Sequence, residues 1–322
     1  MEKDNSIFTC DSFFAGVGGI DKGFELTGHF TTIYANEFDK NACKTFETNF
    51  PIKCDDRDIN VVSEKDVPKA DIVLAGFPCQ AFSIAGYRQG FEDEKGRGVL
   101  FFELLRIIKK IKPRVIFLEN VKNLVGHDDG NTFRVILESL IDAGYHVKHQ
   151  VLNAKDYGNI PQNRERIYIV AFRNKVHYQR FEFPQPIQLA TKLSDVIEYN
   201  KKIDQKLYYT KENCFFYDEL EKAIKNKDTV YQWRRVYVRE NKSDVCPTLT
   251  ANMGTGGHNV PLILTKFGIR KLTPHECFNL QGFPKSFELP KIASTHLYKQ
   301  AGNSVVVSVI ERIAQNIYEA IK

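Results

Sequence analysis

The chain has 322 residues, of which 43% are hydrophobic and 26% charged, with a formal net charge of +5. These values are typical of a globular protein with room for one large domain or two. No apolar run approaches the roughly 18 residues of a membrane span and no segment resembles a signal peptide, which excludes a membrane protein and leaves a cytoplasmic one expected. The mild positive charge permits a polyanionic partner without requiring one.

The cysteine pattern restricts the chemistry further. Seven cysteines are present, and none forms a Cys-x-x-Cys pair. An odd number without paired spacing argues against both a disulfide framework and a zinc site. A reducing compartment and no metal are therefore expected.

The first predicted strand covers residues 7–14 and runs through Ala15-Gly16-Val17-Gly18-Gly19 into a predicted helix over 20–26. Glycines between strand and helix let the backbone approach a nucleotide-like ligand. The next predicted strand ends before Glu37, which lies 21 residues after Gly16, the spacing at which an acid reaches ribose hydroxyls. Position 21 is Asp, not the third glycine of the dinucleotide pattern, which favours a smaller adenosine ligand.

An apolar run over residues 71–76 predicts a strand buried on both faces, and Phe77-Pro78-Cys79 follows it. Cys79 thus lies at the carboxyl end of a strand, where open α/β sheets bind their ligands, and Pro78 restricts the backbone beside it. A cysteine in this place is either a nucleophile or a small buried hydrophobe. The surrounding motifs decide between the two.

The remaining pattern alternates short apolar strands with amphipathic helices up to about residue 175, which predicts a doubly wound sheet. Helices are predicted over 100–111 and 131–143, and strands over 115–118 and 145–152. From Phe183 the helical periodicity fades, and strand-like pieces such as 233–238 follow. Residues 305–322 predict a single helix that packs back on the large domain through an apolar stripe of Val306, Val309, Ile310, Ile313, Ile317 and Ile321.

Ordered sequence blocks then indicate a family. They are Phe14-Ala-Gly-Val-Gly-Gly19, Glu37, Asp58-Ile59, Gly76-Phe-Pro-Cys-Gln-Ala-Phe-Ser83, Arg97-Gly98 to Phe101, Glu119-Asn-Val121, Gln162-Asn-Arg-Glu-Arg166, Arg270 to Pro284, and Gln300 to Val305. In this order, and over nearly the whole chain, they resemble the cytosine-C5 DNA methyltransferases of bacterial restriction–modification systems. One departure is Phe38, where relatives often carry Trp; a smaller ring would still pack on adenine.

The resemblance implies an α/β fold with a doubly wound, Rossmann-like methyltransferase sheet and a second, smaller target-recognition domain. Residues 1–185 with 298–322 are expected to form the catalytic, S-adenosylmethionine-binding domain. Residues 186–297 are expected to form the target-recognition domain and hinge, with recognition itself over 186–269.

The expected reaction needs a nucleophile and an acid. Carbon 5 of cytosine becomes reactive when a thiolate adds to carbon 6, and the resemblance assigns this role to Cys79. Glu119 would act as the acid at ring N3, which requires a raised pKa, with burial as the expected cause. Arg164 and Arg166 lie two apart and would share one face of an extended strand. By resemblance Arg164 braces the ring oxygen and Glu119, whereas Arg166 has a structural or phosphate-contacting role.

The resemblance also implies S-adenosylmethionine as methyl donor, which leaves as S-adenosylhomocysteine. Glu37 would bind the ribose, and Phe38, Asp58 and Ile59 the adenine. The other expected contacts are Phe14, Ala15, Gly16, Val17, Gly18 and Gly19 around the adenosine and methionine parts, Pro78, Leu100 and Val305 as walls, and Asn303 and Ser304 on the methionine side. Leu100 and Val305 can equally be read as plain core residues.

The expected partner is double-stranded DNA, from which the target cytosine must be flipped out. Residues 80–98 lack periodicity and suit a loop that closes over DNA, although a plain surface loop has a similar composition. Arginine forks read guanine edges and glycines let the backbone enter a groove. The expected DNA-binding residues are Gln80, Ser83, Arg97, Arg234, Arg235, Arg239, Thr248, Leu249, Gly256 and Gly257. A monomer that protects host DNA from a separately acting restriction endonuclease is expected.

Three other readings of the sequence stay open at this stage. An RNA methyltransferase would share the scaffold, but the chain lacks the extra Cys-Phe-Thr signature of that branch. A non-catalytic DNA-binding relative is disfavoured by the intact Cys79, Glu119 and Arg164. A nicotinamide oxidoreductase would account for the glycine turn but leaves Pro78-Cys79 and the basic second domain unexplained.

Overall fold

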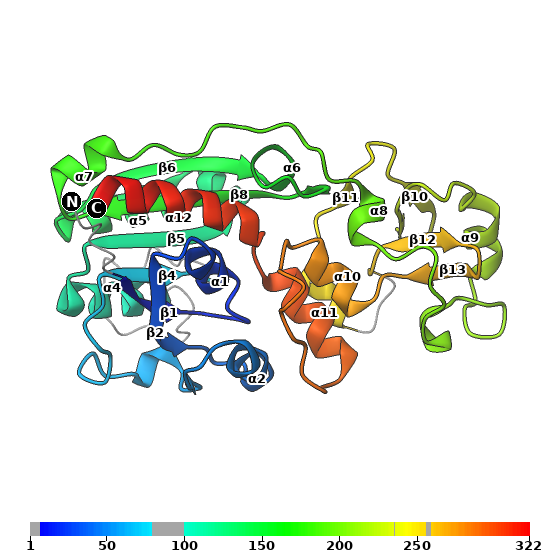
Figure 1. Ribbon diagram of the computed structural model, residues 1–322, viewed down its shortest axis with the longest axis horizontal. Coiled ribbons are helices and arrows are strands. Elements are labelled where there is room, and N and C mark those ends of the chain that lie inside the picture. Colours follow the sequence, from blue (N-terminus) through cyan, green and yellow to red (C-terminus); the bar gives the residue numbers. More distant parts are fainter. Residues whose placement is uncertain (1–6, 79–99, 235, 256–258) are drawn as a thin grey trace. The chain divides into compact units, whose positions relative to one another are not determined.

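The computed structural model describes residues 7–78, 100–234, 236–255 and 259–322, and Figure 1 shows the elements within them. The chain forms two compact units. The first takes in the chain up to Leu152, Glu165–Gln185 and Ile310–Lys322, and the second takes in Asn153–Arg164 and Pro186–Val309. The boundaries of these units differ from those of the two predicted domains. The short strand Gln162–Asn163 pairs with Cys246–Pro247, which draws the segment around it into the second unit.

The first unit is built on a seven-stranded sheet in the order β3-β2-β1-β4-β5-β8-β6. Its strands are β1 Phe8–Phe13, β2 Phe30–Asn36, β3 Cys54–Asp55, β4 Ile72–Ala75, β5 Val115–Val121, β6 His146–Asn153 and β8 Glu165–Phe172. Its helices are α1 Gly19–Leu26, α2 Lys40–Asn49, α4 Leu100–Ile111, α5 Asn131–Asp142, α7 Lys175–Arg180 and α12, together with the short turns η1 Ile59–Val61 and η2 Lys122–Gly126. The pairs β1–β2, β2–β3, β1–β4 and β4–β5 are parallel, whereas β8 runs antiparallel to β5.

Helices cover both faces of this sheet (Figure 1), because side chains alternate along each strand. On β5, Ile116 and Leu118 enter a core shared with α4 and α5. Phe117 points the other way and meets Phe24 of α1, with ring centroids 5.3 Å apart. The predicted doubly wound sheet and the predicted helix over residues 100–111 are therefore confirmed.

The predicted helix over 305–322 is confirmed as α12, Val307–Ile321, and the predicted apolar stripe is buried. A separate helix that was not predicted, α11, Ser294–Asn303, precedes it. The two are split because Ser304 is extended, with φ −70° and ψ 176°. Within the first unit, Tyr318 stacks on His29 with ring centroids 3.5 Å apart.

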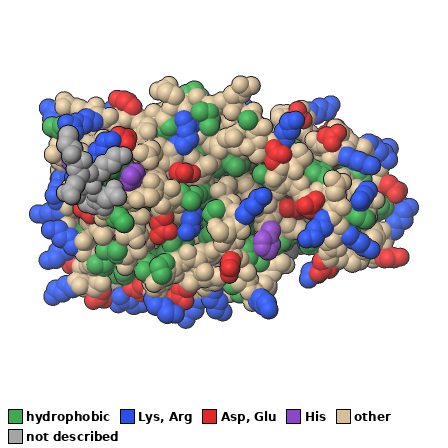
Figure 2. Space-filling model, in the orientation of Figure 1, with side chains coloured by type: hydrophobic (Ala, Val, Ile, Leu, Met, Phe, Trp, Pro, Cys, Tyr) green, Lys and Arg blue, Asp and Glu red, His purple; other side chains and the backbone are tan. Residues whose placement is uncertain are grey.

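The second unit has a four-stranded sheet, β10-β9-β12-β13, and a two-stranded one, β11-β7. Its strands are β7 Gln162–Asn163, β9 Tyr231–Trp233, β10 Val238–Glu240, β11 Cys246–Pro247, β12 Leu262–Thr265 and β13 Gly268–Lys271. Its helical elements are α6 Ala154–Tyr157, α8 Leu193–Val196, η3 Gln205–Leu207, α9 Tyr217–Ala223, η4 Ala251–Gly254, α10 Pro274–Asn279 and α11. On the face seen in Figure 2, basic and acidic side chains are interspersed over both units.

The strand predicted over 233–238 is wrong. Trp233 ends β9 and Val238 begins the antiparallel β10, and these two residues lie opposite each other. The Arg234 N–H donates to the Tyr237 carbonyl at 2.8 Å and the Val236 N–H to the Arg234 carbonyl at 2.8 Å, which closes the turn. A run of β-favouring residues does not by itself reveal such a reversal.

The core of the second unit joins stacked rings to a buried ion pair. Phe216 stacks on Trp233 with ring centroids 4.1 Å apart. Arg270 is fully buried and its Nη2 lies 2.7 Å from Glu276 Oε1. Glu276 also belongs to a capping box with Thr273 at the start of α10. None of the helices in the described parts of the chain has the length and apolar character needed to cross a membrane.

Candidate active site

The turn between β1 and α1 has an unusual backbone that the glycine pattern requires. Gly16 and Gly18 have φ of 58° and 81°, and Phe14 has φ 52°, a region that bulky L residues rarely adopt. A Cβ at Gly18 would lie 2.2 Å from Cε2 of Phe50. Only glycine therefore fits at Gly18, and the strained Phe14 marks this turn as a candidate binding site.

Glu37 is joined to that turn, as the sequence spacing predicts. Its carboxylate accepts the Gly16 N–H at 2.8 Å and the Asp39 N–H at 2.7 Å. Glu37 follows β2, which pairs in parallel with β1, so both features lie at the carboxyl edge of the sheet. Phe38, next in the chain, is 71% exposed and free of the core.

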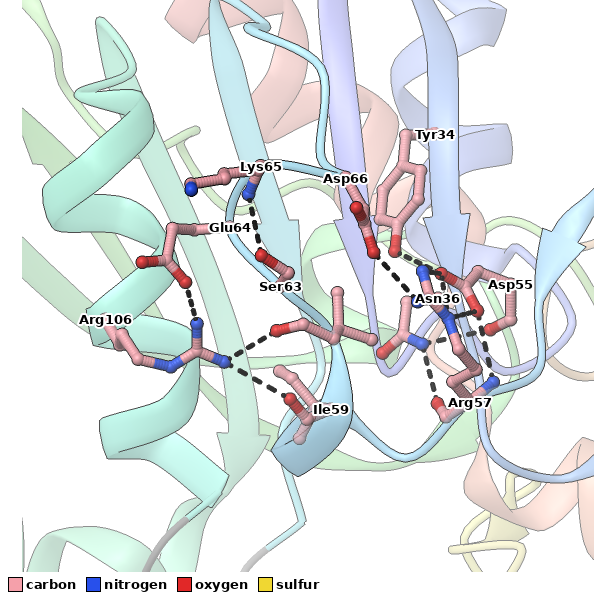
Figure 3. Close-up of polar contacts among 11 residues, drawn as sticks. Tyr34, Asn36, Asp55, Arg57, Ile59, Ser63, Glu64, Lys65, Asp66 and Arg106 are labelled. Atoms are coloured by element: carbon pink, nitrogen blue, oxygen red, sulfur yellow. Dashed lines mark hydrogen bonds and ion pairs between the residues drawn. The ribbon is translucent and has the colours of Figure 1, made fainter.

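Asp58 and Ile59 lie in a turn that is attached to the same strand end (Figure 3). The Asn36 amide donates to the carbonyls of Asp55 at 2.9 Å and Arg57 at 2.8 Å. The Asp58 carboxylate accepts the Asn60 N–H at 2.9 Å and so begins η1. Asn36 precedes Glu37 directly, but the sequence patterns did not assign it a role.

The ends of β4 and β5 hold the expected acid beside the segment that leads to the expected nucleophile. Ala75 of β4 pairs with Leu118 of β5. One residue further on, a Cβ at Gly76 would lie 3.6 Å from Oε2 of Glu119. The Asn120 amide donates to the Phe77 carbonyl at 2.8 Å. Cys79 itself lies outside the described residues, as do Gln80, Ser83 and Arg97.

Glu119 is 8% exposed, and its Oε1 lies 3.1 Å from Nε of Arg166. The sequence led us to expect Arg164 beside Glu119 and a structural or phosphate-contacting role for Arg166. The ion pair is a contact of Arg166 that the sequence did not predict, and the role of Arg164 beside Glu119 stays a prediction. The strand assumed to place both arginines on one face is broken, since β7 ends at Asn163 and β8 begins at Glu165.

Arg164 is 2% exposed and makes several contacts within the second unit. Its guanidinium donates to the carbonyls of Leu249 at 2.7 Å and Gly302 at 3.1 Å, and also to that of Ser304. Arg164 therefore cross-links the segment around Leu249 to the sequence block over residues 300–305. Asn303 is exposed, Ser304 half-buried and Val305 buried.

The predicted DNA-binding residues of the second unit differ in exposure. Arg234 and Arg239 are exposed, whereas Leu249 is 1% exposed and its N–H donates to Gln162 Oε1 at 3.1 Å. Thr248 donates its hydroxyl to the Asn163 carbonyl at 2.6 Å. Thr248 and Leu249 are thus held in the framework of the unit. Arg235, Gly256 and Gly257 lie outside the described residues.

The predicted wall residues of the first unit also differ. Pro78 is exposed, and Leu100, the first residue of α4, is half-buried against the core. Asp21, which replaces the third glycine of the dinucleotide pattern, is fully buried and accepts from the hydroxyls of Ser12 and Thr32 at 3.0 Å each. Burial raises the pKa of Asp21 to about 6. Within the described ranges, no group of three or more His, Cys, Asp or Glu residues is arranged to hold a metal.

The fold agrees with comparisons to known proteins. The family profile of the C-5 cytosine-specific DNA methylases matches residues 8–319. The chain belongs to this family, and it is a DNA cytosine-5-methyltransferase of the bacterial restriction–modification type. The predicted family is thereby confirmed.

Two curated relatives illustrate the likeness. The chain is 64% identical over 309 residues to the Type II methyltransferase M.Bsp6I of Bacillus sp. (strain RFL6), covering 96% of this chain and 98% of the relative. It is 40% identical to the Type II methyltransferase M.HhaI of Haemophilus parahaemolyticus, covering 94% and 92%. A crystal structure of Spodoptera frugiperda DNMT2 superposes with a TM-score of 0.74 at 19% identity, over 97% of this chain and 99% of that one. The last comparison supports the shared fold alone.

Proposed function

We propose that this enzyme methylates carbon 5 of a flipped-out cytosine within a specific short sequence of double-stranded DNA, through a covalent bond between Cys79 and carbon 6. The observation that supports the proposal most directly is that the chain segments at the ends of β4 and β5 contact each other. Glu119 lies beside Gly76, and Asn120 is hydrogen-bonded to Phe77, two residues before Cys79. An acid near the end of β5 and a thiol that follows β4 in the sequence can act on one ring.

In this mechanism the Cys79 thiolate adds to carbon 6 while Glu119 donates a hydrogen bond or proton at N3, which leaves carbon 5 electron-rich. After carbon 5 is methylated, loss of its proton and departure of the Cys79 thiolate restore the aromatic ring. Arg166 holds the Glu119 carboxylate in place through the 3.1 Å ion pair. Arg164 remains proposed, on the resemblance alone, as a brace for the ring oxygen.

S-adenosylmethionine is the proposed methyl donor; when bound it supplies an electrophilic methyl group on sulfur, and S-adenosylhomocysteine is left. The glycine turn fits such a ligand, because its positive-φ backbone and the close approach of Gly18 to Phe50 leave no room for a side chain. Glu37 would bind the ribose and Phe38 would pack on the adenine. Asp58 and Ile59 offer a carboxylate and a backbone N–H, which complement the 6-amino donor and N1 acceptor of adenine.

The other proposed cofactor contacts are the walls Pro78 and Leu100 and, on the resemblance alone, Asn303, Ser304 and Val305. Target choice is proposed to lie within residues 186–269, where Arg234 and Arg239 are exposed. Protection of host DNA in the cytoplasm from a separately acting restriction endonuclease, by a monomeric enzyme, completes the proposal.

Bisulfite sequencing of DNA from bacterial cells expressing the protein tests the activity directly. The expected result is protected cytosines confined to one short motif, present with the intact chain and absent with the Cys79→Ser variant. Unprotected DNA from cells with abundant folded enzyme would contradict the proposal. Protection of RNA instead of DNA would favour the RNA methyltransferase alternative.

A further inference from the structure

Arg106, on α4, is hydrogen-bonded to the turn that is proposed to bind adenine (Figure 3). Its Nη2 donates to the carbonyl of Val62 at 2.8 Å and approaches that of Ile59 at 3.5 Å. These two carbonyls stand at the first residue of η1 and at the residue just after it. One side chain therefore holds both ends of the short helical turn that begins at the proposed adenine-binding pair.

The rest of the Arg106 guanidinium is also engaged. Its Nη1 lies 2.5 Å from Oε2 of Glu64, and its Nε donates to Oε2 of Glu103 at 2.8 Å. Glu103 lies on α4 one turn before Arg106, whereas Glu64 belongs to the segment that contains η1 and Val62. All three guanidinium nitrogens thus have partners, and the planar fork sets the direction of each contact.

A second arginine closes the same turn from within (Figure 3). Arg57 binds Asp55 through Nε at 2.9 Å and Nη2 at 2.7 Å, and its Nη1 donates to Asp66 at 2.8 Å. This guanidinium lowers the pKa of Asp55. Arg57 joins Asp55, the last residue of β3, to Asp66 further along the chain. Arg106 adds an attachment of this segment to a helix, α4.

Recognition of adenine through hydrogen bonds requires the turn to be held in a fixed position. Adenine presents a 6-amino donor and an N1 acceptor, whereas hypoxanthine presents a 6-oxo acceptor and an N1–H donor, so the two purines differ by reversed hydrogen-bonding groups. Discrimination between them requires donors and acceptors within the narrow limits of hydrogen-bond geometry. A loosened turn could still pack on either purine but would no longer tell them apart.

We propose that Arg106 is a positioning residue that sets the preference of this enzyme for adenine over hypoxanthine in its cofactor. The inference rests on the proposed cofactor site at Asp58 and Ile59. It assigns the effect to the directed contacts of the guanidinium with backbone carbonyls and not to its charge. Lysine keeps the charge beside Glu64 and Glu103 but cannot reproduce the fork.

The test uses calorimetric titration of the full-length enzyme with S-adenosylhomocysteine and with S-inosylhomocysteine, its hypoxanthine counterpart. The wild type should prefer the adenine compound by at least about tenfold, the worth of one or two hydrogen bonds. Arg106→Lys should weaken the adenine compound by about tenfold and the inosine compound by less than about threefold, so that the preference collapses. Arg134→Lys is the matched control, since Arg134 is an exposed α5 residue bonded to Glu138 and Asn131.

Each other outcome is informative. A wild type that binds neither compound overturns the cofactor site, and the inference with it. A wild type that prefers adenine, together with an Arg106→Lys enzyme whose preference is intact, overturns the inference alone. Equal weakening of both compounds also overturns it, because that is the signature of a merely structural arginine. If Arg106→Lys does not fold, Arg106→Met decides, because it keeps the length of the side chain and removes its donors, and an unchanged preference in that variant overturns the proposal.

Discussion

The two units hold their proposed functional residues in opposite ways. In the first, Glu37 directly follows β2 and Glu119 lies near the end of β5, and they are fixed by backbone N–H groups and by an arginine, respectively. In the second, Arg234 and Arg239 stand exposed on the β9–β10 hairpin, away from the buried core. Bond-making chemistry needs groups held at fixed distances, whereas exposed side chains on a hairpin can change without disturbing a core. Five predictions test this contrast.

Replacement of Cys79 by Ser should have the largest effect of the five changes. It should affect only the chemical step. The change removes the thiolate and little volume, so methyl transfer should be abolished while cofactor and DNA binding stay close to wild type. Transfer of labelled methyl groups and gel-shift titration measure the two properties. The wild type should also be trapped covalently by DNA with 5-fluorocytosine at the target, since the fluorine cannot leave as a proton does. Methylation without such trapping would refute the covalent mechanism.

Glu119→Gln should slow methyl transfer by about 10² to 10⁴, the usual worth of a general acid. The amide keeps the shape of the side chain but cannot deliver a proton to N3. Single-turnover rates at saturating cofactor measure the effect, and Glu138→Gln, an exposed change on α5, is the control. A rate within a few-fold of wild type would remove Glu119 from the mechanism.

Glu37→Ala should weaken S-adenosylmethionine binding by about 1.5–3 kcal/mol, the worth of hydrogen bonds to a charged group. It also removes the acceptor of the Gly16 N–H. Calorimetry gives the affinity, and a thermal melt separates lost binding from lost folding. Unchanged affinity would mean that the carboxylate serves the turn alone and that the ribose binds elsewhere.

Changes on the hairpin should alter target choice and leave the cofactor untouched. Arg234→Ala or Arg239→Ala should cost ~1–3 kcal/mol and relax one position of the target if the side chain reads a base. A phosphate contact would instead weaken all sequences alike and reduce the salt dependence of binding. Exchange of residues 186–269 for those of a relative with a known target, followed by bisulfite mapping, is the companion test. An active chimera that keeps the original target would contradict the proposal that residues 186–269 choose the target.

The last expected effect concerns stability. Asp11 is fully buried on β1, near the Ala70 N–H, and burial raises its pKa to about 8. The unfolded chain loses this proton near pH ~4, so the free energy of unfolding should fall as pH rises from there through 8, by at most about 1.4 kcal/mol per pH unit. Asp11→Asn should flatten that slope in urea titrations. The exposed Asp142→Asn should not, and an unchanged slope in Asp11→Asn would contradict the assignment.

Much of the first unit could be predicted because its signals are local. The apolar run before Phe77 and the glycines at Gly16 and Gly18 each have one structural solution, and their order identifies the family. The Arg166–Glu119 pair was missed because two arginines at spacing two look equivalent until the strand is seen to break between Asn163 and Glu165. The hairpin at Arg234 was missed because β propensity carries no information on where a strand reverses.

The return of the chain to its starting point has a consequence for synthesis. Tyr318 packs on Phe8 and His29, and Arg114 donates to the Ile321 carbonyl at 3.2 Å. A ribosome adds about 5–20 residues per second, so roughly 15 seconds to a minute pass between the synthesis of β1 and that of its partners in α12. Until then the nascent first unit exposes the apolar surface that α12 will cover. We therefore expect removal of α12 to leave this apolar surface exposed and to make the chain prone to aggregation.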